Sequence, residues 1–312
     1  MLIDDVAPEP PGGSAAPGDR AGGANYAARS HMFIPAFVGT QAAAEIAQRN
    51  RLEPATEQWF DCYKAPLDLY GGGGLYVWPF GVAMFHVVED LELPDLAALA
   101  VWRQRTYQDK LRWATRRLRD LHCDDIPEAL YVFSLYWMAQ PIWSGDTLQA
   151  ALRILSMPKV LLRRDEDADI EQVSAVEQAL LANGFDHPEI VQFGVAGISV
   201  GCASWSAISY HPLQPSHALA EQEAIVCELA TQALWTYSAH INAEAENGRD
   251  PQVPDRYDWR FLRAMRSRLT NARPQESGQH RSMRNAVIET SGIVNHLDHA
   301  IDILRESAGS RT

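Results

Sequence analysis

The chain has 312 residues and a formal net charge of −13 at pH 7, because 40 Asp and Glu face only 27 Lys and Arg. Hydrophobic residues make up 46% of the sequence, enough to bury the core of one large domain or of two domains of ordinary size. A chain this acidic is not expected to bind nucleic acid in general, since neutralising phosphates requires clustered positive charge.

The four cysteines indicate neither a zinc site nor a disulfide framework. Cys62, Cys123, Cys202 and Cys227 lie far apart and form no C-x-x-C pair, so we expect reduced thiols. No apolar run approaches the roughly 18 residues that a membrane-spanning helix needs. The N-terminus also lacks the basic-then-apolar order of a signal peptide. We therefore expect a cytoplasmic protein that has no cofactor and does not contact membranes.

The N-terminal half begins with a polar tail and then alternates strands with helices. Residues 1–30 are rich in Pro, Gly, Ala and acids, a composition that predicts disorder. The apolar segment 75–88 predicts one bent strand or two strands, because Pro79 and Gly81 interrupt it. Residues 94–121 follow as one amphipathic helix, since apolar residues recur every three or four positions.

Four arginines mark the polar side of this helix: Arg105, Arg112, Arg116 and Arg119. In so acidic a chain, such a positive stripe predicts a surface that binds an acidic protein partner or an acidic part of the same protein. A solvated or internally paired helix face is the competing interpretation, and the sequence alone favours it.

The second half begins after the acidic run at residues 165–169, which we interpret as a boundary between the two halves. The apolar segment 189–210 predicts two strands or one long bent strand, and a long helix covers about residues 216–247. The tetrapeptide FGVA occurs at residues 80–83 and again at 193–196, each time in a strand that leads into a long helix. This recurrence hints at an internal duplication.

The last 60 residues are expected to be helical. Apolar residues in the final helix alternate by four and three positions, at Met283, Val287, Thr290, Val294, Leu297, Ile301 and Leu304. This period is typical of a helix packed along another helix, so we expect an antiparallel hairpin of two helices that also favours homo-oligomer formation. Eight arginines against two acids lie between Arg256 and Arg284, and pairing with the acids of residues 221–255 would account for them without a partner.

Together these elements predict an α+β protein with two strand-and-helix halves, a mainly antiparallel sheet and a coiled-coil-like C-terminal helical hairpin. The expected domains are the tail at residues 1–30, the α+β halves at 31–164 and 170–250, and the hairpin at 251–308.

One motif matches a catalytic pattern. Residues 197–201, GISVG, fit G-x-S-x-G, in which the serine of a hydrolase stands on a tight turn between a strand and a helix. Here the residues after Gly201 alternate like another strand, and no helix is expected before Ser216. We therefore expect a glycine-rich core strand, with a serine hydrolase that uses Ser199 as the alternative function.

Two other patterns do not indicate a site. The glycines at residues 71–74 precede a strand, whereas a phosphate-binding loop follows a strand and precedes a helix. His296 and His299 are spaced so that both imidazoles reach one metal ion, yet no third ligand is evident.

The segment YVWPFGVAMFHVVEDLELPDLAALAVWRQRTY, residues 76–107, resembles actinobacterial proteins of about this length, the caspase and tetratricopeptide-repeat-associated proteins of bacterial conflict systems. The resemblance rests mainly on these 32 residues and on the helical C-terminus, and no motif with a chemical role carries it. It implies an accessory or sensor protein that works beside a caspase-like peptidase or a repeat protein, without catalytic residues of its own. A non-enzymatic interaction or regulatory protein is therefore the expected function.

Overall fold

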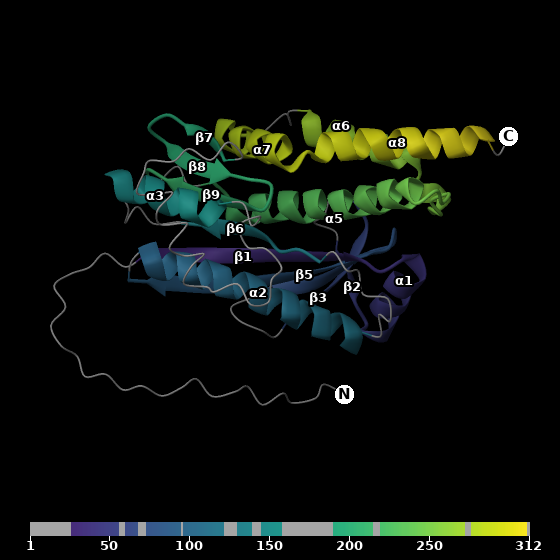
Figure 1. Cartoon of the computed structure of the whole chain (residues 1–312), viewed down its shortest axis with the longest axis horizontal. Coiled ribbons are helices and arrows are strands. Elements are labelled where there is room, and N and C mark those ends of the chain that lie inside the picture. The colour runs from purple at the N-terminus through teal and green to yellow at the C-terminus, as the bar shows by residue number, and fades with distance from the viewer. Residues whose placement is uncertain are drawn as a thin grey trace.

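The computed structural model describes residues 26–55, 60–67, 73–94, 96–121, 130–138, 145–157, 190–214, 219–271 and 276–310. These residues form an α+β fold with a mostly antiparallel sheet, as the sequence predicts, and helices cover both faces of the sheet (Figure 1). Residues 1–25 of the predicted tail and the expected boundary at residues 165–169 lie outside the described residues.

One sheet contains all nine strands of the described residues, in the order β2-β3-β4-β5-β1-β6-β9-β8-β7. The strands are β1 (Tyr26–Phe37), β2 (Glu53–Ala55), β3 (Cys62–Pro66), β4 (Gly73–Trp78), β5 (Val82–Leu93), β6 (Phe133–Trp137), β7 (Val191–Val195), β8 (Ser199–Ala203) and β9 (Ala207–Pro212). Neighbouring strands are antiparallel except β6 and β9, which are parallel. Because β6 and β9 come from the two expected halves of the chain, these halves share one continuous sheet.

The helices form layers on the two faces of this sheet (Figure 1). They are α1 (Thr40–Arg49), α2 (Leu96–Asp120), α3 (Gly145–Ser156), α5 (Glu221–Glu246), α6 (Trp259–Thr270), α7 (Gly278–Ser291) and α8 (Ile293–Ser310), with a short 3-10 turn η3 (Asp255–Tyr257) before α6. Helices α1, α2 and α3 pack on one face, and α5 packs on the other face. Helices α6 and α8 lie outside α5, and α7 covers β7 and β8. Among the described residues, no helix is long and apolar enough to cross a membrane.

Helix α5 is the central helix of the fold. It lies between the sheet and the outer helices, and 15 of its 26 residues are buried. A helix in that position needs apolar or internally bonded side chains on all sides, which explains why its sequence shows no single apolar stripe. The largest core surrounds it and includes the fully buried Phe33, Trp78, Phe80 and Tyr237.

Helix α2 matches the predicted helix within two residues at its start and one at its end. Its buried side chains Leu99, Ala100, Ala114 and Leu118 pack against the sheet and α3, as the apolar periodicity predicts. Arg103 is also buried, and its guanidinium donates hydrogen bonds to backbone carbonyls at the end of α3. The apolar face and this arginine fix the rotation of α2, and thereby determine which side chains it presents outward.

The apolar segment 75–88 forms two strands, one of the two predicted alternatives, which turn at Gly81 with φ 98°. Three boundaries differ from the sequence-based expectation. The segment 189–210 forms three strands, since a second tight turn follows Ala203. The expected final helix is divided at Gly292, whose left-handed φ of 63° ends α7 before α8 begins. Strand β1 starts at Tyr26, so residues 26–30 belong to the sheet, although their composition groups them with the tail.

Candidate functional site

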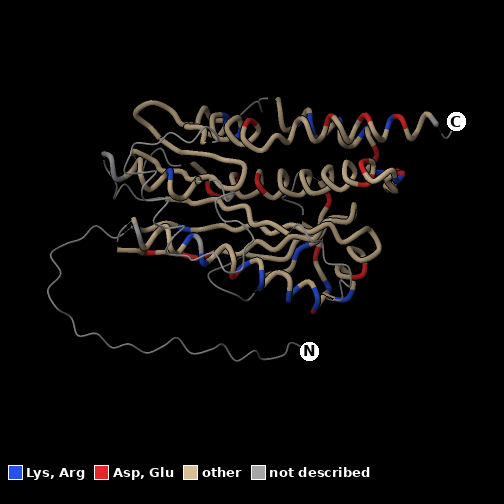
Figure 2. Tube along the Cα trace, in the orientation of Figure 1, with Lys and Arg blue, Asp and Glu red and all other residues tan. Residues whose placement is uncertain are grey.

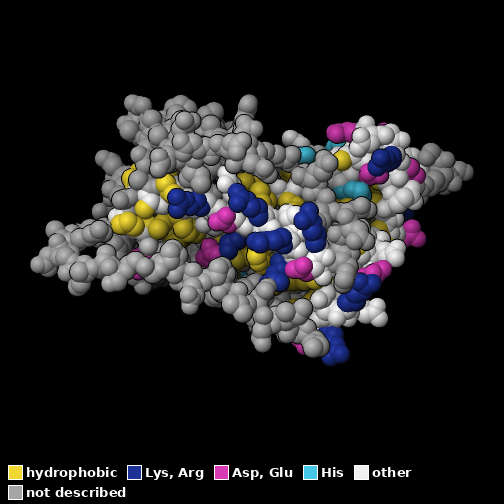
Figure 3. Space-filling view, turned by 60° about the horizontal axis from the view of Figure 1, so that its bottom comes forward, with side chains coloured by type: hydrophobic (Ala, Val, Ile, Leu, Met, Phe, Trp, Pro, Cys, Tyr) yellow, Lys and Arg dark blue, Asp and Glu magenta, His cyan; other side chains and the backbone are white. Residues whose placement is uncertain are grey.

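The four predicted arginines all lie exposed on the outer face of α2, and we call them the arginine face: Arg105, Arg112, Arg116 and Arg119. At 3.6 residues per turn, they fall within about 60° of the helix circumference and within about 21 Å of its length. Figure 2 shows basic positions repeated along α2, and Figure 3 shows Lys and Arg side chains gathered in a row across this side of the molecule. The arginines therefore form one straight positive stripe.

The arginine face is unpaired within the described part of the chain, where none of its members forms an ion pair. The other cations of α2 are occupied. Arg103 binds backbone carbonyls, Lys110 pairs with Glu89, and Arg117 lies 3.7 Å from Asp120. The structure thus separates a set of internally bonded cations from a set that forms no ion pair with the described residues.

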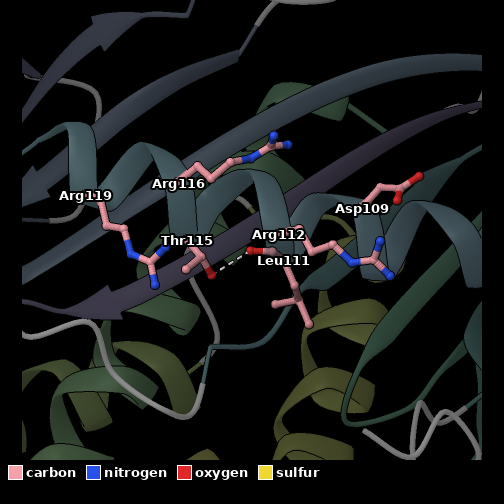
Figure 4. A pocket seen from close by; sticks show the side chains of 6 residues that line it. All are labelled: Asp109, Leu111, Arg112, Thr115, Arg116 and Arg119. Carbon is pink, nitrogen blue, oxygen red and sulfur yellow. Dashed lines mark hydrogen bonds between the residues drawn. The ribbon is translucent and has the colours of Figure 1, made fainter. Parts of the chain in front are cut away.

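An open surface hollow of about 630 Å³ runs along the C-terminal half of the same face (Figure 4). It is lined by Asp109, Leu111, Arg112, Thr115, Arg116 and Arg119. The Thr115 hydroxyl donates to the Leu111 carbonyl at 2.9 Å, so its hydrogen is already used within the helix. Arg105 lies outside the hollow, about one turn before Asp109.

Guanidinium side chains give this surface groups that can recognise anions, although the Asp109 carboxylate also lines the hollow. A guanidinium presents planar donors that match a carboxylate in a bidentate geometry and keeps its charge at any physiological pH. Basic residues near the C-terminal end of a helix also interact favourably with the helix dipole, which by itself explains the presence of Arg116 and Arg119 near the end of α2. It does not explain Arg105, which lies about four turns from that end. The full stripe is better suited to an elongated acidic surface than to one small ion.

Ser199, the alternative catalytic residue, is the first residue of β8, directly after the turn from β7. The residue is only 4% exposed, and its buried hydroxyl forms no hydrogen bond with a histidine or any other group of the described residues. A serine nucleophile needs a base within hydrogen-bond reach. This strand-turn-strand arrangement therefore does not favour a hydrolase.

The glycines of the GISVG motif have structural roles in this hairpin. Gly197 adopts a left-handed φ of 73° in the turn, a conformation that favours glycine. At Gly201 a Cβ atom would come within 2.3 Å of the Phe193 ring and 2.6 Å of the Ser209 carbonyl oxygen. Phe193 thus packs directly over the glycine backbone, which accounts for the motif without catalysis.

Replacing Gly201 with alanine is expected to lower the free energy of unfolding by about 1–3 kcal/mol, the usual cost of overpacking a core. Urea unfolding of the purified variant measures this change. Gly309→Ala is the control, because no atom lies within 4 Å of a Cβ there and helix α8 favours alanine. Equal stability of the two variants would show that the Gly201 contact does not constrain the hairpin.

A second polar cluster joins β1, β5 and α5. His31 Nε2 lies 2.7 Å from Glu221 Oε1, and His31 Nδ1 lies 3.1 Å from His86 Nε2. His86 also stacks on Phe33, with ring centroids 4.9 Å apart. Both histidines are buried, and Glu221 is partly exposed at the start of α5. Because a carboxylate only accepts, the His31 Nε2 nitrogen donates, and the chain of bonds connects surface carboxylate to buried imidazole.

The pKa values of His86 and Glu221 are both lower than their ordinary values. Burial, together with the adjacent His31, lowers the pKa of His86 to about 3. The hydrogen bond from His31 lowers the pKa of Glu221 despite the opposing effect of burial, and the Arg29 charge contributes in the same direction. The described residues contain no group of three His, Cys, Asp or Glu side chains that could hold a metal ion. The cluster therefore links α5 to the sheet through hydrogen bonds.

The cluster predicts a steep loss of stability in acid. Folded His86 stays neutral down to about pH 3, whereas an unfolded histidine binds a proton below its ordinary pKa of 6.5. The contribution of His86 to stability should therefore fall by up to about 1.4 kcal/mol per pH unit as the pH drops from 6.5 toward 3. His86→Gln, followed by urea unfolding at several pH values, should give a shallower dependence. His299→Gln, at an exposed histidine, should keep the wild-type slope. An unchanged slope in His86→Gln would contradict the assignment.

The arginines of residues 256–284 are largely used inside the protein, as expected, but their acidic partners differ from the expected ones. Arg256 lies 2.5 Å from Asp61, and Arg266 donates to Asp298 at 2.8 Å. Arg284 binds Glu276 at 2.7 Å. Among the expected acids of residues 221–255, Glu223 lies 3.2 Å from His280 of this segment. Of the acidic partners, Asp298 lies on α8, Glu276 lies just before α7, and Asp61 lies just before β3.

Comparison of the chain with models of protein families, with curated proteins and with solved structures gives no match.

Proposed function

We propose that this chain is a non-enzymatic interaction or regulatory protein of the cytoplasm that binds an acidic partner protein through the arginine face of α2. The observation that carries the proposal is the stripe of four exposed arginines, unpaired among the described residues, on a chain whose net charge is −13. The resemblance of residues 76–107 adds a setting, in which the partner is a caspase-like peptidase or a repeat protein of a bacterial conflict system.

The charge distribution favours one docking orientation. An acidic partner is repelled by most of this protein and attracted by the arginine face, so its encounters concentrate on α2. A single exposed ion pair contributes only about 0.2–1 kcal/mol, but four along one helix act together. Such binding depends on salt, because charges on a surface are screened over about 8–10 Å at physiological ionic strength.

Charge reversal of the arginine face should abolish binding. We expect the tagged wild-type chain to recover a stoichiometric partner from its native cells, and Arg112→Glu/Arg116→Glu to recover less than about a tenth as much. The physical reason is that four favourable charges become two favourable and two repulsive ones. The measurement is quantitative affinity capture at physiological salt, with circular dichroism to verify folding.

The matched control is Arg51→Glu/Arg263→Glu. Both residues are exposed, neither forms an ion pair within the described residues, and neither lies on α2. The control changes the net charge from −13 to −17, since each reversal adds −2, as the α2 variant does. Recovery of the partner by both variants would contradict the proposal, as would isolation of the wild type as a lone stable monomer.

A further inference from the structure

The spacing of the arginine face carries information about the shape of its partner. Measured from Arg105, the other three arginines lie at about 10.5, 16.5 and 21 Å along the axis of α2, from a rise of 1.5 Å per residue. All four remain within about 60° of arc, so the charges lie nearly on a line parallel to the helix. The partner must present its acids along a comparable line.

An extended segment does not match these intervals. Side chains on one face of a strand repeat about every 6.8 Å, so a position at about 10.5 Å falls where the side chain points to the opposite face. A second helix lying along α2 matches them directly, because it has the same rise per residue. Acids at i, i+7, i+11 and i+14 would face the arginines in a parallel arrangement. Acids at i, i+3, i+7 and i+14 would do so in an antiparallel arrangement.

The surface beside the stripe also suits a packed helix. Leu111 and Thr115 are half-buried and line the hollow next to Arg112, Arg116 and Arg119. Because the Thr115 hydroxyl donates to its own helix, this row is largely apolar toward a partner. The axes of packed helices lie about 8–10 Å apart, so the contact needs a row of short side chains between longer ones. The hollow provides it.

We infer that the partner binds α2 with an acidic amphipathic α-helix, whose carboxylates follow the arginine spacing and whose apolar edge packs over Leu111 and Thr115. The inference rests on the proposed function and specifies the secondary structure that the arginine face recognises. An acidic disordered tail would satisfy the charge of the stripe but not its spacing.

Designed peptides test the inference with the purified full chain. Two labelled helical peptides carry four glutamates on one face, in the parallel or the antiparallel spacing, and a third has the same composition with its glutamates distributed around the helix. Fluorescence anisotropy at low salt gives the three affinities. We expect the better of the two striped peptides to bind at least about tenfold more tightly than the third, and Arg112→Glu/Arg116→Glu to remove the difference.

Equal affinity of all three peptides would overturn the helix inference while leaving an acidic partner in place, since binding would then follow charge alone. If none of the three peptides bound, the helix inference would also be overturned. The proposed function has a separate test, because capture of the native partner does not depend on these peptides. Leu111→Lys supplies an independent readout, since a longer side chain in the hollow should weaken binding of the better striped peptide more than binding of the third peptide.

Discussion

Replacement of Glu228 with glutamine is expected to raise the free energy of unfolding by about 3 kcal/mol at pH 7. Glu228 lies in the middle of α5 and is 1% exposed. Burial raises the pKa of its carboxyl group from 4.5 to about 8, although a hydrogen bond from Gln232 acts in the opposite direction. That bond is 3.3 Å long, and Tyr131 in turn donates to Gln232 at 2.9 Å. The folded protein therefore keeps Glu228 protonated at pH 7, which costs free energy that a neutral glutamine amide at this position does not cost.

The sign follows from the two pKa values. The unfolded carboxyl loses its proton near pH 4.5, whereas the folded one keeps it until about pH 8. Between these values the folded state binds the extra proton, so the contribution of Glu228 to stability falls by about 1.4 kcal/mol per pH unit as the pH rises, and it levels off above pH 8. Glutamine does not titrate, so the variant should show none of this decline.

Urea unfolding at pH 5, 6, 7 and 8 measures the effect as a difference that grows with pH. Glu246→Gln, at an exposed position on the same helix, should change stability little at every pH. Parallel curves for the wild type and Glu228→Gln would show that Glu228 is ionised in the folded state.

Removal of Arg284 is expected to destabilise the protein by about 3–5 kcal/mol, the usual cost of breaking a buried ion pair. The side chains of Arg284 and Glu276 are each 4% exposed and pair at 2.7 and 2.9 Å in a bidentate geometry. Arg284 also donates to the Leu269 carbonyl at 2.7 Å, which joins the end of α6 to α7. Arg284→Met retains much of the volume but leaves the Glu276 carboxylate without its bidentate cation.

The double variant Arg284→Met/Glu276→Leu distinguishes a loss of charge pairing from a loss of packing. Replacing both members of a buried pair with apolar groups is often close to neutral, so most of the lost stability should return. Urea unfolding of the wild type, the single variant and the double variant gives the comparison. A double variant as unstable as the single one would assign the effect to packing around the Arg284 stem.

Local patterns made α2 and its arginine face predictable. Helical periodicity located Leu96–Asp120 and identified which side faces solvent, because both depend on residues three or four positions apart. The same reasoning placed α5, although not its burial on all sides. In GISVG, the alternation after Gly201 correctly predicted a strand in place of a helix. The α+β class and the mainly antiparallel sheet followed from these elements.

Long-range pairing was not predictable from this sequence. His31 and His86 are 55 positions apart, and only the antiparallel register of β1 and β5 brings them together. Glu221 is 190 positions from His31 and reaches it because α5 crosses the sheet at β1. The parallel pairing of β6 with β9, which makes one sheet of both halves, has no local signal either. The internal partners of the C-terminal arginines were missed for the same reason.

The most direct test of the proposed role of the arginine face is the affinity of the isolated complex as a function of salt. The wild-type complex should weaken steeply as the salt concentration rises from about 50 to 300 mM, because the Debye length shortens over that range. Arg112→Glu/Arg116→Glu should bind at least about tenfold more weakly at low salt and show little salt dependence. An affinity that neither salt nor the reversal changes would contradict the role of α2 as the docking surface.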